Sequence, residues 1–304
     1  MLCSHFAPFG AADIPEYLEY LEKSETEISD ACISSRIAWN AGFRYQKAII
    51  AGLYCLISDG GVFTTPHLVM PIGPVSRQSI RQVVDEIYPH FEHLGWPMRI
   101  LYIDECHLPL FDSPQHYDIK ISHNPCFSDY VYDAASLVSL TGKSLHAKRN
   151  HVNRFFREHP DFSYATLTAG DRDECLTLVS DWCAERNLDC RDLRQSDFRA
   201  IRTLFDHFDQ LSVRGGLIRV GREVAAFAMG SLCRSTGIIH FEKAKTEMTG
   251  LYAAINKLVV EQEFPDCLEI NREEDMGIEG LKKAKLSYGP TRMIHKFEAV
   301  LTPH

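Results

Sequence analysis

The stretch GIIHFEKAKTEMTGLYAAINKLVVEQEFPDCLEIN, residues 237–271, decides the fold because it holds three elements in a fixed order. Residues 237–244 and 267–271 are apolar runs of the kind that form buried strands. Between them apolar residues recur at helical spacing, in the stripe of a helix that lies on a sheet: Leu251, Ala254, Ile255, Leu258 and Val259. The stretch therefore predicts a strand, an amphipathic helix and a second strand.

The flanking sequence extends this pattern through the second half of the chain. Strands are predicted at 162–168, 217–221, 224–232 and 291–301, and helices after Asp171, after the cap Ser196 and at 277–288. The resulting order is strand, helix, helix, three strands, helix, strand, helix, strand.

The first half repeats the later part of that order without repeating the residues. Strands are predicted at 47–58, 62–70, 98–104 and 117–122, and a helix follows Ser76. At 304 residues the chain exceeds the usual size of one domain, about 100–200 residues. We therefore predict two similar α/β domains in tandem, residues 1–135 and 136–304.

Composition indicates an ordinary globular protein, with 45% apolar and 24% charged residues. The longest apolar candidate for a membrane span, Ala48–Ser58, falls short of the roughly 20 residues that a span requires. The N-terminus lacks the features of a signal peptide, so we expect a cytoplasmic protein. Ten cysteines lie scattered with no CxxC pair, so neither a disulfide framework nor a metal site is expected.

Charge is unevenly distributed along the chain. The net charge of −9 argues against a surface that coats nucleic acid throughout. Residues 143–157 nevertheless hold five cations and no acid, which suits phosphate contacts with tRNA or an anionic head group. A solvated helix that pairs with acidic neighbours is the alternative. The candidate contacts are Lys143, Lys148, Arg149 and Arg154.

Four segments together resemble a known family: 129–155, 240–244, 249–256 and 270–290. The element order resembles the GNAT acyltransferase fold, and the segments resemble the phosphatidylglycerol lysyltransferase C-terminal domain family. The resemblance implies an α/β protein of two tandem GNAT-like domains, each a central mixed sheet flanked by helices. It also implies transfer of an amino acid from charged tRNA to the head group of a membrane lipid.

Other donors and acceptors stay open at this point. A small amine or hydroxyl compound is an alternative acceptor, and acyl-coenzyme A is an alternative donor. The segment Lys245–Leu251 offers only one glycine, and Glu247 would repel a pyrophosphate there. No other cofactor is expected. A third hypothesis is a tandem domain without catalytic activity that uses its cleft for binding.

The resemblance also locates a candidate cleft. In a GNAT-like sheet the strands before and after the main helix diverge, and here their ends carry the charged runs 240–243 and 271–275. Candidate catalytic residues, for base or acid roles, are Glu242, Glu273, Asp275 and Tyr288. Candidate substrate-binding residues are Lys243, Tyr252, Asn256, Asn271, Arg272, Glu274 and Lys285. The alternative is a buried ion-pair network that ties the two strands together.

Overall fold

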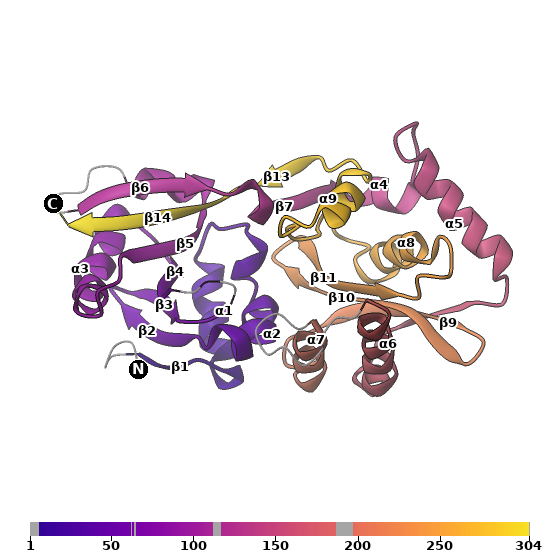
Figure 1. Ribbon diagram of the computed structural model, residues 1–304, viewed down its shortest axis with the longest axis horizontal. Helices are drawn as coiled ribbons and strands as arrows, with labels where there is room; N and C mark the ends of the chain where they lie inside the picture. The colour runs from indigo at the N-terminus through magenta and orange to yellow at the C-terminus, as the bar shows by residue number, and fades with distance from the viewer. Residues whose placement is uncertain (1–5, 62, 64, 112–116, 187–196, 304) are drawn as a thin grey trace. The chain divides into compact units, whose positions relative to one another are not determined.

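The computed structural model describes residues 6–61, 63, 65–111, 117–186 and 197–303, which form two compact units (Figure 1). Of these residues, those up to Ser128 and those from Ile294 onward make up the first unit. Those from Asp129 to Met293 make up the second. The boundary predicted between residues 135 and 136, where two independently folding domains would meet, stays a prediction. The predicted helix cap Ser196 lies outside the described residues.

The first unit is built on a mixed sheet of seven strands among the described residues. In spatial order they are β1 (Ala7–Pro8), β2 (Gln46–Ile50), β3 (Leu53–Ser58), β4 (His67–Ile72), β5 (Met98–Asp104), β14 (Lys296–Pro303) and β6 (Tyr117–His123). Among the described strands of this sheet, only β4 and β5 pair in parallel. The helices are α1 (Ile14–Glu22), α2 (Ile33–Phe43) and α3 (Arg77–His93), and a 3-10 segment, η3, covers Glu105–Phe111.

The second unit is built on another mixed sheet of seven strands among the described residues. In spatial order they are β13 (Arg292–Ile294), β7 (Asp129–Asp133), β12 (Glu269–Asn271), β11 (Thr236–Ala244), β10 (Glu223–Cys233), β9 (Arg214–Val220) and β8 (Ser163–Thr166). The strands β11 and β12 pair in parallel. The helices are α4 (Ala134–Ser139), α5 (His146–Glu158), α6 (Arg172–Glu185), α7 (Asp197–Asp206), α8 (Leu251–Glu263) and α9 (Glu279–Leu286).

Helix α8 forms the centre of the second core, as its apolar stripe predicts. Leu251, Ala254, Ile255 and Val259 are fully buried and share one cluster with residues of α5 and the sheet. Helices α6 and α7 cover the opposite face of the sheet (Figure 1). Burial of this apolar stripe is the main contribution that holds α8 against the sheet, since burying apolar surface contributes about 25 cal/mol per Å² to stability.

Two predicted strands are each divided in the structure. The run 47–58 is a hairpin of β2 and β3, because Ala51 and Gly52 take positive φ values of 50° and 74° and turn the chain. The run 291–301 is broken at His295 into β13 and β14. Strand β13 belongs to the second sheet, whereas β14 pairs with β5 and β6 of the first. Apolar alternation alone does not reveal either break.

The cysteines require one correction. Seven described cysteines are free, as expected, but Cys183 in α6 is disulfide-bonded. A single disulfide depends on how closely two Cα atoms approach rather than on a sequence motif. The scattered spacing of the ten cysteines therefore gave no sign of it.

The N-terminus of α8 lies directly against the backbone of α5. Gly250, the N-cap of α8, has φ +91°, and a Cβ there would lie 2.0 Å from the carbonyl oxygen of His151. Only glycine fits this position without moving α5 away from α8.

Gly250→Ala is therefore expected to lower the free energy of unfolding by about 2 kcal/mol or more, because a clash and a left-handed backbone combine. Chemical denaturation measures this change. The matched control is Gly280→Ala in α9, where a Cβ meets nothing within 4 Å. That variant is expected to be neutral or stabilised by up to about 1 kcal/mol. Equal effects at the two positions would contradict the packing described here.

Candidate functional site

The candidate site lies where the parallel strands β11 and β12 stop pairing. Their register runs from Thr236 opposite Glu269 to Ile238 opposite Asn271, and β11 then continues to Ala244 paired with β10 but no longer with β12. Open α/β sheets bind ligands at the carboxyl ends of such diverging strands. The charged runs expected at this edge are therefore placed on neighbouring segments of one unit.

A buried ion pair joins the two strand ends. Arg272 Nη2 contacts Glu242 Oε2, and the two side chains are only 12% and 14% exposed. Asn256, fully buried on α8, donates from Nδ2 to Glu242 Oε1 at 2.8 Å. Glu242 therefore faces α8. Three candidates from three different elements meet in one network.

Two tyrosines and a lysine surround the guanidinium of Arg272. Its Cζ lies 4.7 Å from the ring centre of Tyr288 and 5.6 Å from that of Tyr132, while Lys148 Nζ lies 4.3 Å from the Tyr288 ring. Burial raises the pKa of Tyr288 to about 12, although Arg272 opposes the shift. The phenol thus keeps its proton at neutral pH. Burial, and then repulsion from Arg272, lowers the pKa of Lys148.

Two polar atoms of this network lack a hydrogen-bond partner among the described residues. They are Nη1 of Arg272, a donor, and Oδ1 of Asn256, an acceptor, and both are buried. An unmet buried donor or acceptor costs about 1–3 kcal/mol, so such atoms point to a bound molecule or water. The network thus offers one hydrogen-bond donor and one acceptor next to the positive charges of Arg272 and Lys148.

Lys285 anchors the loop that follows β12. Its Nζ contacts the carbonyl oxygens of residues 272, 273 and 274, the last two at 2.9 and 2.7 Å. Glu273 in this loop has φ +57°, a conformation that a non-glycine residue takes only when its surroundings hold it. Burial, and then Arg272, lowers the pKa of Lys285 to about 8. Lys285 therefore positions the loop rather than lying free to contact a substrate.

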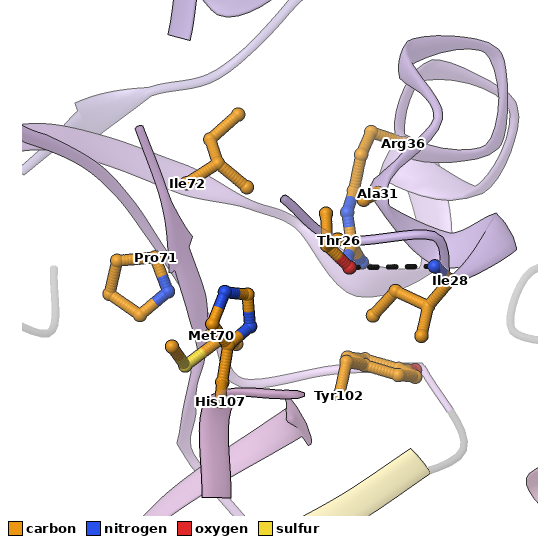
Figure 2. Close-up of a pocket in the computed structure, with 9 residues that line it drawn as sticks. All are labelled: Thr26, Ile28, Ala31, Arg36, Met70, Pro71, Ile72, Tyr102 and His107. Carbon is orange, nitrogen blue, oxygen red and sulfur yellow. Dashed lines mark hydrogen bonds between the residues drawn. The ribbon is translucent and has the colours of Figure 1, made fainter. Parts of the chain in front are cut away.

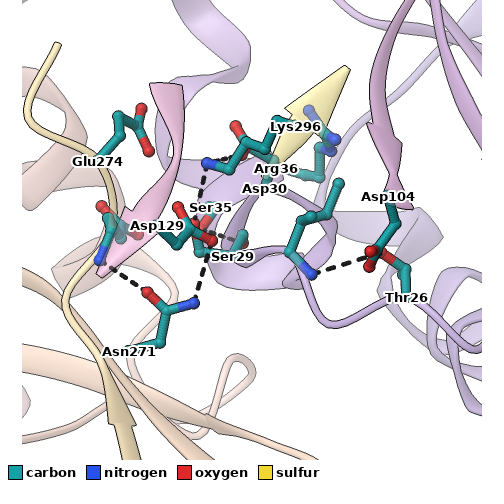
Figure 3. A network of polar contacts seen from close by, with 12 residues as sticks. Thr26, Ser29, Asp30, Ser35, Arg36, Asp104, Asp129, Asn271, Glu274 and Lys296 are labelled. Carbon is teal, nitrogen blue, oxygen red and sulfur yellow. Dashed lines mark hydrogen bonds and ion pairs between the residues drawn. The ribbon is translucent and has the colours of Figure 1, made fainter. Parts of the chain in front are cut away.

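The other predicted residues of this loop also have structural partners. Asn271 donates to Asp129 Oδ2 at 3.0 Å and accepts from the Glu273 N–H at 2.8 Å (Figure 3). Asp275 is fully buried and accepts from Tyr130 Oη at 2.6 Å. These contacts tie the loop to β7. Glu274 lies half-buried in the same loop.

The side chain of Glu273 is hydrogen-bonded to His240. His240 Nδ1 lies 2.8 Å from Glu273 Oε1, and its Nε2 lies 2.7 Å from Ser231 Oγ. A bulge between β10 and β11 makes His240 the extra residue, since the partner of Met229 is Phe241 and that of Gly230 is Ile239. The simple alternation of side chains along β11 does not hold through this bulge.

Lys243 and Tyr252 belong to a separate group. Lys243 Nζ pairs with Asp197 at 2.6 Å and lies 3.7 Å from the ring centre of Trp182 in α6. The indole N–H of Trp182 donates to Tyr252 Oη at 2.9 Å. Lys243 therefore points to the face of the sheet opposite Glu242.

The basic segment contributes one residue to the site. Of the four predicted phosphate contacts, only Lys148 reaches the tyrosines around Arg272. Arg149 donates to the Leu140 carbonyl oxygen at 2.6 Å and Arg154 pairs with Glu158, while Lys143 is exposed before α5. Arg149 and Arg154 thus support α5 locally.

Sequence reasoning missed Tyr132, which contacts both Arg272 and Tyr288. Its hydroxyl donates to the Lys285 carbonyl oxygen at 2.9 Å. The available signal was the alternation of DYVYD in β7, which puts Tyr130 and Tyr132 on one face. That signal needed the pairing of β7 with β12, which joins segments more than a hundred residues apart.

Comparison with known proteins identifies structures of the same fold. A structure from Bacteroides thetaiotaomicron, a conserved protein of unknown function, is 29% identical with a TM-score of 0.87, covering 98% of this chain and 99% of that one. The C-terminal domain assigned to a lysylphosphatidylglycerol synthetase of Agrobacterium fabrum is 14% identical with a TM-score of 0.66, covering 95% and 92%. A Mycoplasmoides gallisepticum protein is 25% identical over 187 residues, which span 60% of this chain and 58% of that relative.

The two mixed sheets and their helices define a protein of two tandem GNAT-like domains. The family model for the phosphatidylglycerol lysyltransferase C-terminal region matches residues 35–300, and the chain belongs to that family. The fold and the family implied by the sequence are thus confirmed. Among the described residues, every helix is too short or too polar to traverse a bilayer.

Proposed function

We propose that the chain transfers an aminoacyl group from charged tRNA to an amine or hydroxyl acceptor at the Glu242–Arg272 network. The observation that carries the proposal is the pair of buried atoms without partners, Arg272 Nη1 and Asn256 Oδ1. A site that binds an ester and its attacking group needs one such donor and one such acceptor. Membership of the lysyltransferase C-terminal family supports the choice of charged tRNA as donor.

In the proposed reaction the acceptor attacks the carbonyl carbon of the aminoacyl ester. Arg272 Nη1 donates to the oxygen that becomes negative, and Lys148 adds positive charge beside it. Tyr288 keeps its proton at neutral pH and gives it to the departing ribose oxygen, while the acceptor loses its own proton to a carboxylate. Glu242 and Glu273 are the candidates for that base. A lipid head group is the acceptor that the family suggests.

The same geometry disfavours acyl-coenzyme A as the donor. GNAT enzymes that use this cofactor hold its pyrophosphate at the N-terminus of the main helix, which is α8 here. The backbone of α5 approaches that N-terminus closely at Gly250, and its nearest polar atom is the His151 carbonyl oxygen, which repels an anion. Glu247 is exposed just before the helix. Acetyl-coenzyme A is therefore expected to give no saturable heat in calorimetric titration.

The direct test offers the purified chain single tRNAs charged with labelled amino acids, together with phosphatidylglycerol vesicles. The expected result is label that passes into the organic extract with one or a few of these tRNAs. Transfer to a small amine instead would keep the aminoacyl donor and change the acceptor. No loss of label from any charged tRNA, together with saturable binding of acetyl-coenzyme A, would overturn the proposal.

Lys148→Glu is expected to weaken transfer at least tenfold, because it places a carboxylate against Tyr288 and Arg272. Separately, the affinity of the wild-type chain for charged tRNA is expected to fall steeply as the salt concentration rises. The matched control is Arg154→Glu on the same helix, whose arginine pairs with Glu158. Equal transfer by Lys148→Glu and wild type would place the reaction elsewhere.

A further inference from the structure

Buried polar atoms without partners do not by themselves indicate a ligand site in this protein. In the first unit, Arg36 Nε and both ring nitrogens of His107 lack partners among the described residues, and these side chains line a cavity of about 10 Å³ (Figure 2). That volume has room for about one water molecule, which suffices to serve them. The edge of the second sheet differs, because a carboxylate there is partly exposed to solvent.

Glu273 carries this carboxylate, in the loop that follows β12. Its side chain is 22% exposed, and its Oε1 lies 2.8 Å from His240 Nδ1. The other oxygen, Oε2, has no hydrogen-bond partner among the residues that the structure describes. A general base needs an oxygen of this kind, because it takes up a proton from the attacking group.

The backbone of Glu273 is fixed by neighbouring elements. Its N–H donates to Asn271 Oδ1 at 2.8 Å, and its carbonyl oxygen accepts from Lys285 Nζ at 2.9 Å and from the Tyr130 N–H at 3.2 Å. These contacts come from β12, α9 and β7 and hold the φ of +57°. Strain of this kind is retained where a side chain needs a defined direction.

His240 fixes the side chain of Glu273. The imidazole is 3% exposed, and its Nε2 lies 2.7 Å from Ser231 Oγ. An ionised carboxylate only accepts hydrogen bonds, so Nδ1 of His240 carries the proton that points to Glu273 Oε1. In the neutral ring, Nε2 then accepts from the Ser231 hydroxyl. The bulge between β10 and β11 brings His240 to this position.

Glu242, the other candidate base, already accepts hydrogen bonds at both oxygens. Oε1 accepts from Asn256 Nδ2 at 2.8 Å, and Oε2 contacts Arg272 Nη2. A proton on Glu242 would remove the counter-charge of a guanidinium that is 12% exposed, and an unpaired buried charge is strongly disfavoured. The ion pair therefore suits Glu242 to holding Arg272 in place rather than to taking up a proton.

We infer that Glu273 is the general base of the proposed aminoacyl transfer and that His240 is its positioning residue, an inference that rests on the proposed function. Glu273 follows Arg272 directly, so the base and the oxyanion donor belong to neighbouring residues. Glu273 Oε2 takes the acceptor's proton as the acceptor bonds to the carbonyl carbon and the ester bond breaks. Tyr288 protonates the ribose oxygen, and the proton on Glu273 then returns to Tyr288 through solvent.

Glu273→Gln tests the base in the transfer assay with charged tRNA. Glutamine still accepts from His240 but takes up no proton, so kcat is expected to fall at least about 100-fold. The KM for charged tRNA and the free energy of unfolding are expected to change little. The matched control is Glu279→Gln, an exposed glutamate of α9 whose replacement leaves transfer unchanged.

The outcomes of this assay separate the inference from the proposed function. If the wild-type chain transfers label and Glu273→Gln transfers it equally well, only the inference fails. If the wild-type chain transfers no label from any charged tRNA, the proposed function fails and the inference fails with it.

Two variants of His240 test its positioning role. His240→Asn puts an amide N–H where Nδ1 lies, so kcat is expected to stay within about fivefold of wild type. His240→Leu removes this donor, and kcat is expected to fall at least about tenfold while the KM for charged tRNA stays the same. Equal kcat values for the two variants would overturn the positioning role.

A measurement on the wild-type chain covers the case in which a variant does not fold. The ¹⁵N resonances of the His240 ring report which nitrogen carries the proton, whatever the activity of the chain. A protonated Nδ1 at neutral pH is the expected result. A neutral ring with its proton on Nε2 would leave no donor for Glu273 and would overturn the inference.

Discussion

Glu242→Gln is expected to reduce aminoacyl transfer at least 100-fold and to destabilise the second unit by about 3–5 kcal/mol. The change leaves the Arg272 guanidinium, 12% exposed, without its counter-charge. Glu242 also accepts from Asn256 Nδ2 at 2.8 Å, and glutamine keeps only one acceptor oxygen for the two donors that Glu242 serves, Asn256 and Arg272. Transfer assays with charged tRNA and chemical denaturation measure the two effects separately.

The double variant Glu242→Gln with Arg272→Met separates a catalytic role from a structural one. Removing both charges takes away the unpaired cation, so we expect about 1–3 kcal/mol of the lost stability to return. Transfer is expected to stay at the level of the single variant, because the oxyanion donor is gone as well. If transfer returned together with stability, the pair would only join the two strands, and the catalytic groups would lie elsewhere.

The sequence predicts most of the second unit because its signals are local. The stripe from Leu251 to Val259 and the strands on either side need only neighbouring residues for their interpretation, and the structure confirms them. The order of strand, helix and strand also brings Glu242, Asn256 and Arg272 into contact, while their role as site residues stays a prediction. Local pattern thus specifies this part of the fold, and the family resemblance points to the three residues at its edge.

What the sequence does not predict depends on pairing across long distances. Strand β14 joins β5, almost 200 residues earlier in the chain, and no local signal assigns it to the first sheet. Tyr132 reaches Arg272 only because β7 pairs with β12. The partners of Lys243 are of the same kind, since Asp197 and Trp182 come from other helices. The types and spacing of residues identify strand ends that carry charged side chains. The register between strands determines which of these side chains contact one another.

Lys285→Met is expected to change how the stability of the second unit depends on pH. The pKa of Lys285 is lowered to about 8 in the folded protein, against about 10.4 for an unfolded lysine. Between these pH values the unfolded chain holds a proton that the folded chain has released, so the free energy of unfolding rises with pH. This contribution of Lys285 to the free energy of unfolding reaches about 3 kcal/mol above the pKa of the unfolded lysine and is absent below pH 8.

The measurement compares the free energy of unfolding of wild type and Lys285→Met at several pH values from 7 to 10.5. Trp182 reports on the second unit once Trp39 and Trp96, both in the first, are replaced with Phe. Lys282→Met is the matched control, since Lys282 is an exposed lysine of the same helix. The difference between wild type and Lys285→Met should grow with pH, and that between wild type and Lys282→Met should stay flat. A difference for Lys285→Met that is flat or falls with pH would contradict this expectation. The contacts of Lys285 with the carbonyl oxygens of residues 272–274 would then favour the ammonium enough to cancel the cost of burial. The loop would be held by a permanent positive charge.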